Sequence, residues 1–450
     1  MEYMAEIRRN GSGIGLSGDE RRRIVFINRF FYPDHSATSQ MLSGLVFELA
    51  KDYPVWIIAS RQLYENPKAD LPPREVISGV VVRRVRTSGF GRHRLAGRAL
   101  DYVTFYLGAA AALVRITRPG DLIIAKTDPP LISVMAVAIA ALRGCTVFNW
   151  IQDLFPEVAL VLKVRGMNWG APVLRRLRNW SLRRAAANIV LGERMQERLQ
   201  AQGVPPSRIR VIANWADGES LKPIAPENNA LRAEWGLEDS FVVGYSGNLG
   251  RAHEFETILD AIRRLRNRPK IRFLFIGGGA QRAEIEQFVR ERNLPNVLFR
   301  PYQPTEQLAY SLSAADIHLV SLRPGLEGLI VPSKFYGVCA AGRATLYVGD
   351  PEGDVPRIIR GAGCGRTIES GDGASLAEII DEWSKDPDTV RAMGRQARSA
   401  FERSFEKRHA VQAWSVMLGS LAPDKAENRA AASDEVSLSK SLKSDHIGLP

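Results

Sequence analysis

A glutamate and a lysine in the glycine-rich segment 324–342 have the chemical types that a phosphorylated sugar would require. Glu327 lies among glycines, where its carboxylate can accept hydrogen bonds from sugar hydroxyl groups. The spacing predicts a helix over residues 333–341, which puts Ser333 and Lys334 at its N-terminus, a position that favours a phosphate. The alternative for Lys334 is an ordinary solvated surface charge. The segment therefore predicts contacts to both parts of a sugar phosphate.

A second glycine-rich turn, YSGNLGR, directly follows an expected strand and precedes an expected helix. Gly247 and Asn248 lie in this turn, where glycines let backbone N–H groups approach a phosphate. Arg251 can add a charge-assisted hydrogen bond. Gly278, in a glycine triplet that ends another strand, is expected to line the same cleft near a nucleotide base. For both segments the alternative is a tight turn without a ligand, and neither contains the dinucleotide-binding pattern G-x-G-x-x-G.

Four polar residues of the N-terminal half follow expected strands. Gln152 and Asp153 come after the strand that ends near Trp150, and the carboxyl ends of strands are favoured positions for a site. Asp34 and His35 lie in the loop after the first strand. Asp153 can equally cap the next turn, and a lone histidine is more often structural than catalytic. These four residues are candidates for the chemistry, each with a structural alternative.

The elements that must hold these residues alternate between short apolar strands and helices, which predicts parallel sheets in an α/β fold. Strands are expected at residues 24–27, 55–59, 122–125, 146–150, 188–191 and 209–212, and again at 242–245, 271–276, 297–299 and 317–320. The proline-containing segment 222–229 has the composition of a linker between two doubly wound domains. Ligands bind outside the carboxyl ends of such strands, so the cleft between the domains is the expected site.

The chain is therefore expected to have four parts. These are a flexible extension at residues 1–20, an N-terminal domain at 21–222, a C-terminal domain at 223–420 and a charged, disordered tail at 421–450. The last helix of the C-terminal domain is expected to cross back to the N-terminal domain.

The net charge of +12 over 450 residues favours anionic partners. Nucleic acid is not expected among them, because no recognition motif accompanies the charge. Cys145, Cys339 and Cys364 are widely spaced and show no metal-binding pattern, so reduced thiols and no metal site are expected.

Two basic stretches, residues 92–105 and 174–184, mix arginines with leucine and aromatic side chains. They predict amphipathic helices on an anionic membrane surface, with a solvated helix face as the alternative. The most apolar segment, residues 131–142, is shorter than the roughly 20 residues of a spanning helix, so a buried helix and no transmembrane segment are expected. No signal peptide is recognised at the N-terminus, which predicts a cytoplasmic, peripheral membrane protein.

Taken together, several segments resemble the family 4 retaining glycosyltransferases, in particular those of colanic-acid, O-antigen and exopolysaccharide synthesis. The matching segments are FFYPDHSATSQ, TDPP, IQDLFPE, VLGERM, VIANWAD, GYSGNLG, FIGGG, AADIHLVSL and GLEGLIVPSKFYGVCAAGR. Their order and spacing carry the resemblance. It implies the GT-B fold, in which two Rossmann-like domains face an interdomain cleft.

The resemblance also implies a role for each domain. The C-terminal domain would hold a nucleotide sugar, with the turn of Gly247 and Asn248 beside the diphosphate and Glu327 against the sugar hydroxyl groups. The N-terminal domain would hold the acceptor. Retention would proceed by front-face attack, with the leaving phosphate helping to take the acceptor proton. No cofactor is implied, and no metal, because cationic side chains and helix dipoles offset the leaving charge.

Three positions depart from the pattern of many members. A ribose-binding glutamate is replaced by Gly337, and a histidine before the aspartate of IQDLFPE is replaced by Gln152. Asn248 and His253 occupy the places of an arginine and a lysine on the first C-terminal turn. Arg251 and Lys334 are therefore expected to supply the positive charge for the phosphate, and the identity of the donor stays open.

The sequence thus predicts a hexosyl- or N-acetylaminosugar transferase that uses a UDP- or GDP-sugar. The expected acceptor is a polyprenyl-diphosphate-linked saccharide in bacterial exopolysaccharide, capsule or O-antigen synthesis. Two alternatives remain: a nucleotide-sugar 2-epimerase of the same architecture, which would need acid and base groups around the sugar, and a non-catalytic scaffold of a polysaccharide assembly.

Overall fold

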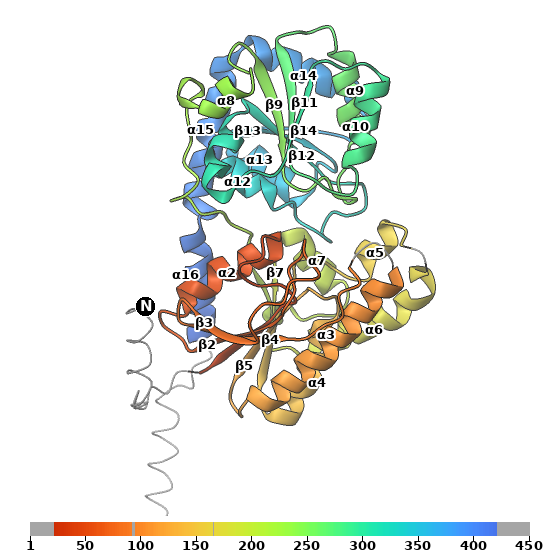
Figure 1. Cartoon of the computed structure of the whole chain (residues 1–450), viewed down its shortest axis with the longest axis vertical. Coiled ribbons are helices and arrows are strands. Elements are labelled where there is room, and N and C mark those ends of the chain that lie inside the picture. Colours follow the sequence, from red (N-terminus) through yellow and green to blue (C-terminus); the bar gives the residue numbers. More distant parts are fainter. Residues whose placement is uncertain (1–21, 92–94, 165, 421–450) are drawn as a thin grey trace, which may run out of the picture.

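The computed structural model describes residues 22–91, 95–164 and 166–420, which form two lobes stacked along the long axis of the molecule (Figure 1). The expected flexible extension, 1–20, and the expected disordered tail, 421–450, lie outside the described residues. Each lobe is a largely parallel sheet between layers of helices, so the prediction of two doubly wound, Rossmann-like domains is confirmed.

The N-terminal lobe contains an eight-stranded sheet in the order β3-β4-β2-β1-β5-β6-β7-β8, with β3 antiparallel to β4. The strands are β1 (Ile24–Ile27), β2 (Val55–Ser60), β3 (Arg74–Ile77), β4 (Val80–Val85), β5 (Leu122–Lys126), β6 (Thr146–Trp150), β7 (Ala187–Val190) and β8 (Ile209–Val211). The helices are α2 (Ala37–Leu49), α3 (Leu95–Ile116), α4 (Ile132–Arg143), α5 (Glu157–Val161), α6 (Met167–Arg184) and α7 (Glu193–Gln200). The central strands are buried runs of apolar residues because helices cover both faces of the sheet.

The C-terminal lobe contains a six-stranded parallel sheet in the order β11-β10-β9-β12-β13-β14. The strands are β9 (Phe241–Ser246), β10 (Ile271–Ile276), β11 (Val297–Arg300), β12 (Ile317–Ser321), β13 (Ala344–Val348) and β14 (Gly365–Ile368). The helices are α8 (Ala230–Glu234), α9 (Glu256–Arg264), α10 (Arg282–Glu291), α11 (Leu308–Ser313), α12 (Lys334–Ala340), α13 (Asp354–Ala362), α14 (Gly373–Lys385), α15 (Pro387–Ser404) and α16 (Lys407–Gly419). Most of these helices pack on the sheet of their own lobe.

Helix α16 runs from the C-terminal lobe onto the N-terminal lobe, where it contacts α2 (Figure 1). Its Trp414 is fully buried and packs edge-on against Trp150 of β6, with the ring centres 5.1 Å apart. The Lys407 ammonium at the start of α16 is 2.7 Å from the Asp217 carboxylate. The N-terminal core is therefore completed by the last described helix of the chain.

The carboxyl ends of the two sheets face each other, and the loops that follow the strands touch. The N–H of Leu154, after β6, donates to the carbonyl of Leu329 in the loop after β12, at 2.9 Å. The Asp354 carboxylate of the C-terminal lobe accepts the Arg194 N–H of α7 at 3.1 Å, which satisfies an otherwise unpaired amide of that helix end. These contacts close one side of the space between the lobes.

Helix α3 is an exception to the expectation that no segment is long and apolar enough to span a membrane. Residues Ala96–Ile116 have a mean hydropathy of 1.4, and 28% of that stretch is buried. Phe105, Ala109 and Leu113 pack one face of α3 into the core of the N-terminal lobe. The side chains of Leu100, Val103, Leu107 and Val114 are exposed at helical spacing. Helix α3 is thus packed on the sheet along one face and exposes apolar side chains on another.

Helix α6 contains the second expected basic stretch, but one of its arginines points inward. Arg178 is buried, and its guanidinium donates to the Glu157 carboxylate and to the Phe155 carbonyl. The helix expected over residues 174–184 is therefore formed, but Arg178 is not part of its exposed basic face. A buried guanidinium needs a carboxylate partner, and Glu157 at the start of α5 supplies it.

Candidate active site

The turn after β9 and the N-terminus of α12 meet through a single cation. The Lys334 ammonium donates to the Tyr245 hydroxyl and to the Asn248 carbonyl, the latter at 3.4 Å, and lies 3.7 Å from the centre of the Tyr245 ring. A Cβ added at Gly247 would lie 3.8 Å from Lys334 Cε. The structure therefore brings Lys334 to the turn of Gly247 and Asn248, from which it is far apart in the sequence.

Lys334 makes no ion pair with an acidic residue of the described chain, and burial holds its pKa well below the usual range. A phosphate anion at the turn would supply the missing negative charge and favour the charged ammonium. His253 lies nearby, with Nδ1 2.7 Å from the Ser321 carbonyl. Burial, together with the Lys334 charge, lowers the pKa of His253 to about 3. His253 is therefore neutral at physiological pH and leaves the phosphate charge to other residues.

Gly278 borders the same turn from the end of β10. Its carbonyl accepts the Leu249 N–H at 2.7 Å and the Tyr302 hydroxyl at 3.3 Å. The neighbouring Gly277 has a φ of +125°, and a Cβ at this position would lie 2.3 Å from the Gly247 carbonyl oxygen. Glycine is required here because two turns approach each other backbone to backbone.

Two further predicted residues flank the turn, and one cation beside it was missed. Arg251 is exposed on the turn itself. Ser333 is the N-cap residue of α12 and makes no side-chain capping hydrogen bond. Arg323, exposed after β12, donates to the His253 carbonyl at 3.2 Å and to the Gln281 side chain at 3.0 Å. Its position at a strand's carboxyl end was the signal that the sequence offered.

Glu327 lies in the loop after β12, apart from the lysine. Its carboxylate accepts a hydrogen bond from the Tyr347 hydroxyl of β13. A Cβ added at Gly353 would lie 2.4 Å from Glu327 Oε2, so this glycine makes room for the carboxylate. Burial raises the pKa of Glu327 to about 7, against the effect of the Tyr347 hydrogen bond, and Asp350 adds to the rise. The carboxyl group is thus balanced between its two protonation states near neutral pH.

Asp153 and Gln152 lie where the two lobes touch. The backbone of Asp153 pairs with that of Ile330, three residues beyond Glu327. Asp153 also lines a small cavity of about 30 Å³, large enough for a water molecule. Asp153 Oδ1 and Gln152 Nε2 are buried without a hydrogen-bond partner among the described residues. Burial raises the pKa of Asp153, although a Thr127 hydrogen bond opposes the rise. Both side chains are therefore available to a polar ligand.

The contacts of Asp34 favour its structural alternative over a part in the chemistry. One carboxylate oxygen accepts the N–H of Ser36 at 2.8 Å, and the other accepts the N–H of Tyr64. This carboxylate therefore ties two loops of the N-terminal lobe together, as aspartates in turns commonly do. Its neighbour His35 is exposed near the end of the same loop, two residues before α2.

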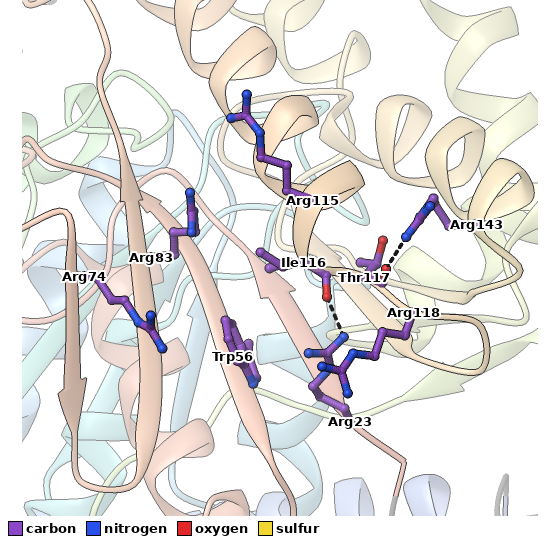
Figure 2. Close-up of a pocket in the computed structure, with 9 residues that line it drawn as sticks. All are labelled: Arg23, Trp56, Arg74, Arg83, Arg115, Ile116, Thr117, Arg118 and Arg143. Carbon is purple, nitrogen blue, oxygen red and sulfur yellow. Dashed lines mark hydrogen bonds between the residues drawn. The ribbon is translucent and has the colours of Figure 1, made fainter. Parts of the chain in front are cut away.

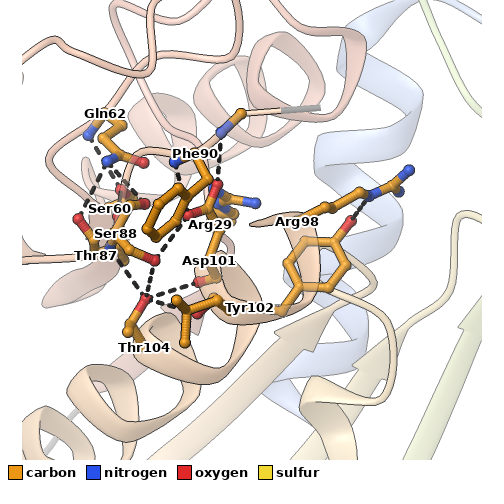
Figure 3. Close-up of polar contacts among 12 residues, drawn as sticks. Arg29, Ser60, Gln62, Thr87, Ser88, Phe90, Arg98, Asp101, Tyr102 and Thr104 are labelled. Atoms are coloured by element: carbon orange, nitrogen blue, oxygen red, sulfur yellow. Dashed lines mark hydrogen bonds and ion pairs between the residues drawn. The ribbon is translucent and has the colours of Figure 1, made fainter. Parts of the chain in front are cut away.

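A buried carboxylate that the sequence did not single out organises the opposite wall of the N-terminal lobe (Figure 3). Asp101 accepts hydrogen bonds from the Ser88 hydroxyl at 2.7 Å and from the N–H groups of Phe90 and Gly91 at 3.1 and 3.0 Å. The Arg29 guanidinium lies 3.4 Å from Asp101 Oδ2, the oxygen that also accepts the Gly91 N–H. Asp101 thus fixes the loop after β4 against the beginning of α3.

Tyr102 lies between two guanidinium groups, with those of Arg29 and Arg98 each 5.3 Å from its ring centre (Figure 3). Arg98 Nε also donates to the Tyr102 hydroxyl at 2.8 Å. Burial raises the pKa of Asp153, and the charge of Arg98 opposes that rise. The sequence instead assigned Arg98 to a membrane-facing stretch, although the i,i+4 spacing of Arg98 and Tyr102 was a signal that they share a helix face.

Comparison with protein families assigns both lobes. The N-terminal lobe matches the Glycosyl transferase 4-like domain over residues 37–215, and the C-terminal lobe matches Glycosyl transferases group 1 over residues 227–400. The chain belongs to the group 1 glycosyltransferases. This family membership makes the chain an enzyme and favours sugar transfer over the scaffold alternative.

Named relatives of this glycosyltransferase include two bacterial proteins. It is 28% identical over 324 residues to the probable glycosyltransferase WbjE of Pseudomonas aeruginosa, covering 70% of this chain and 78% of WbjE. It is 29% identical over 210 residues to the putative colanic acid biosynthesis glycosyl transferase WcaI of Escherichia coli K12, covering 45% of this chain and 51% of WcaI. The solved structure of Anabaena Alr3699/HepE with UDP and glucose superimposes with a TM-score of 0.68 at 15% identity, covering 89% of this chain and all of HepE. The GT-B fold is thereby confirmed.

Proposed function

We propose that this glycosyltransferase transfers a sugar, with retention of configuration, from a UDP- or GDP-sugar to a polyprenyl-diphosphate-linked saccharide. The observation that carries the proposal is the Lys334 ammonium, which lies at the glycine turn of β9 without an acidic partner among the described residues. A half-buried cation beside a glycine turn suits a diphosphate. The proposed place for the nucleotide sugar is therefore the C-terminal lobe.

In the proposed reaction, the bond between the anomeric carbon and the diphosphate breaks as the acceptor hydroxyl forms a bond on the same face. The acceptor proton passes to the departing phosphate oxygen. Negative charge grows on the diphosphate during this step, and Lys334 stabilises it. Glu327 would orient the sugar through its hydroxyl groups, with Tyr347 holding the carboxyl group in place. No metal is invoked, since Lys334, Arg251 and Arg323 supply positive charge.

The acceptor would enter from the N-terminal lobe. Asp153 Oδ1 and Gln152 Nε2 have no hydrogen-bond partner among the described residues, and the backbone of Asp153 pairs with Ile330 of the other lobe. Such groups can bind the hydroxyl groups of an incoming saccharide. A diphosphate-linked acceptor would also place negative charge near Arg98 and Arg29.

A peripheral position on the inner face of the cytoplasmic membrane completes the proposal. Helices α3, α4 and α6 lie side by side on one flank of the N-terminal lobe (Figure 1). Their exposed apolar side chains are Leu100, Val103, Leu107 and Val114 on α3, Leu142 on α4, and Trp169, Val173 and Leu177 on α6. The Trp169 indole is 93% exposed, and tryptophan favours the boundary between lipid and water. Exposed arginines of α6, such as Arg176, suit anionic headgroups.

The relatives support the pathway and the nucleotide. WcaI is named for colanic acid biosynthesis, and the HepE structure contains UDP and glucose. WcaI supports polysaccharide synthesis as the pathway, and HepE supports a UDP-sugar as the first donor to try.

The direct test is a nucleotide panel on the purified protein, in which UDP, GDP and ADP are each titrated by calorimetry. Lys334→Ala is expected to weaken binding of the preferred diphosphate by about tenfold or more, because a charge-assisted contact is lost. Lys270→Ala, an exposed lysine at the opposite edge of the same sheet, is the matched control. Equal affinity of wild type and Lys334→Ala would refute the assignment of the diphosphate to this turn.

A second experiment separates transfer from epimerisation. The preferred nucleotide sugar is incubated with the protein alone and then with a polyprenyl-diphosphate-linked saccharide, and the products are resolved by mass spectrometry and NMR. A longer saccharide with unchanged anomeric configuration is expected only when the acceptor is present. A changed sugar without acceptor would instead indicate the 2-epimerase.

A further inference from the structure

A hollow of about 390 Å³ lies in the N-terminal lobe at the amino ends of β1 and β2, beside the C-terminal end of α3 (Figure 2). The proposed active-site cleft lies at the carboxyl ends of the same strands, so the length of the strands separates the hollow from the cleft. The hollow, which we call the arginine basin, is lined by Arg23, Arg74, Arg83, Arg115, Arg118 and Arg143. The indole of Trp56 lies among them.

Strand register puts part of the basin on one face of the sheet. Arg74 of β3 lies directly opposite Arg83 of β4, and Trp56 of β2 pairs with Val81, two residues before Arg83. Directly opposed like charges destabilise a strand pair unless something of opposite charge lies between them. The Arg74–Arg83 pair is therefore poorly explained by the stability of the sheet and better explained by a bound anion.

Two of the arginines are held in place by the end of α3. Arg23 donates to the Ile116 carbonyl at 2.5 Å and pairs with Asp121. Arg143 donates to the Thr117 carbonyl at 2.7 Å, and its Nε is buried without a hydrogen-bond partner. The partial negative charge of the helix C-terminus helps to orient both guanidinium groups. Arg23 is also neutralised by Asp121, whereas no described ion pair includes Arg143.

The other four arginines have no such partner. Within residues 22–91, 95–164 and 166–420, no ion pair or hydrogen bond engages the guanidinium groups of Arg74, Arg83, Arg115 or Arg118. In Figure 2, Arg74 and Arg83 lie on one side of Trp56 and Arg23 and Arg118 on the other, while Arg115 extends away along α3. Among the described ion pairs of the basin arginines, Asp121 is the only carboxylate, and it is paired with Arg23.

We propose that the arginine basin is a second anion-binding site, for a phosphate- or diphosphate-bearing group. A guanidinium group can donate two parallel hydrogen bonds to the oxygens of a phosphate, whereas a lysine ammonium interacts with it as a point charge. The Trp56 ring, over which the Arg23 guanidinium lies at 5.3 Å, offers an apolar surface for the remainder of the ligand. The exposed Val114 of α3 is next to the basin residue Arg115, so the phosphate can come from an anionic lipid headgroup or from a free phosphorylated compound.

The test is calorimetric titration of inorganic pyrophosphate into the full-length protein in a Lys334→Ala background, which weakens the proposed diphosphate contact at the β9 turn. Arg74→Gln/Arg83→Gln is expected to reduce pyrophosphate affinity by about tenfold or more, since two charge-assisted contacts are lost. Arg74 is on the edge strand β3 and Arg83 on the adjacent β4, so turnover of the nucleotide sugar by the same pair of changes in the otherwise wild-type chain should be unaffected.

The control is Arg290→Gln/Arg292→Gln, which removes the same charge from exposed positions at the end of α10 in the other lobe. An equal loss of affinity in this control would mean that net charge alone attracts pyrophosphate, and the basin would be rejected. Unchanged affinity in Arg74→Gln/Arg83→Gln would reject it as well. Thermal unfolding of each variant verifies that the fold is intact.

Vesicle sedimentation identifies the source of the phosphate. Wild type and Arg74→Gln/Arg83→Gln are compared on phosphatidylcholine vesicles with and without phosphatidylglycerol. If the variant loses its preference for phosphatidylglycerol together with pyrophosphate affinity, a lipid headgroup fills the basin. If the preference is retained while pyrophosphate affinity falls, the occupant is a free phosphorylated compound.

Discussion

Replacing Glu327 by glutamine should make the protein more stable at alkaline pH and leave its stability at acidic pH almost unchanged. Burial raises the pKa of this carboxyl group from 4.5 to about 7. The folded protein therefore binds the proton more tightly than the unfolded chain does. Between pH 4.5 and about pH 7 the unfolded chain binds fewer protons than the folded protein, so the free energy of unfolding falls as the pH rises. Glutamine removes this loss because it does not ionise.

The size of the effect follows from the displacement of the pKa. At about 1.36 kcal/mol for each tenfold change in proton affinity, a rise from 4.5 to about 7 corresponds to about 3.4 kcal/mol above pH 7. This is an upper value, since Glu327 is only half-buried and solvent weakens the effect. The glutamine oxygen can still accept from the Tyr347 hydroxyl, so the local hydrogen bond is retained.

Urea unfolding at pH 5 and pH 8, followed by tryptophan fluorescence, measures the difference. Glu327→Gln should gain stability relative to wild type between the two pH values, while Glu284→Gln, an exposed carboxylate on α10, should not. The same variant should lose most of its turnover if Glu327 binds the donor sugar. A stability difference that is independent of pH would refute the argument from burial, whatever happens to turnover.

Three other predictions test the fold and the cation. Trp414→Ala should cost about 3–5 kcal/mol by chemical denaturation, because α16 fills the N-terminal core through this side chain. Gly192→Ala should cost about 1–2 kcal/mol, since its Cβ would meet the Asp354 carboxylate at 2.3–2.6 Å, whereas Gly361→Ala, with open space around it, should stabilise by about 0.5–1 kcal/mol. Binding of UDP at pH 8 should take up protons, because a phosphate beside Lys334 raises the pKa that burial lowers; calorimetry in buffers of different ionisation enthalpy measures this, and Lys334→Ala should abolish it.

The sequence by itself predicted the two-domain α/β architecture, since runs such as Ile24–Ile27 and Ile271–Ile276 are short, apolar and followed by helical patterns. It did not predict β3 and β4, whose arginines and glutamate interrupt the apolar pattern at the edge of the sheet. It also missed β13, Ala344–Val348, a five-residue strand directly after α12. Short strands of this kind depend on neighbouring strands for their pairing, which is information from elsewhere in the chain.

The candidate site divides in a similar way. Gly247, Gly278 and Lys334 could be identified from glycine turns and strand ends, because local residue types determine local backbone geometry. The sequence did not reveal which group each of these side chains contacts, because contacts across the fold depend on packing between distant segments. The sequence left Asp34 as a candidate for catalysis, yet its carboxylate is engaged by two loops.

The charged residues show most clearly what the sequence alone does not determine. The sequence determined that this chain is basic, that it alternates strands and helices, and that its glycine turns suit a phosphate. Only the tertiary structure decided that Arg178 is neutralised inside the N-terminal lobe while Arg74 and Arg83 face each other without a carboxylate between them in the described chain. The physical reason is that the effect of a charge depends on its distance to other charges and on its burial, and both are set by segments far apart in the sequence.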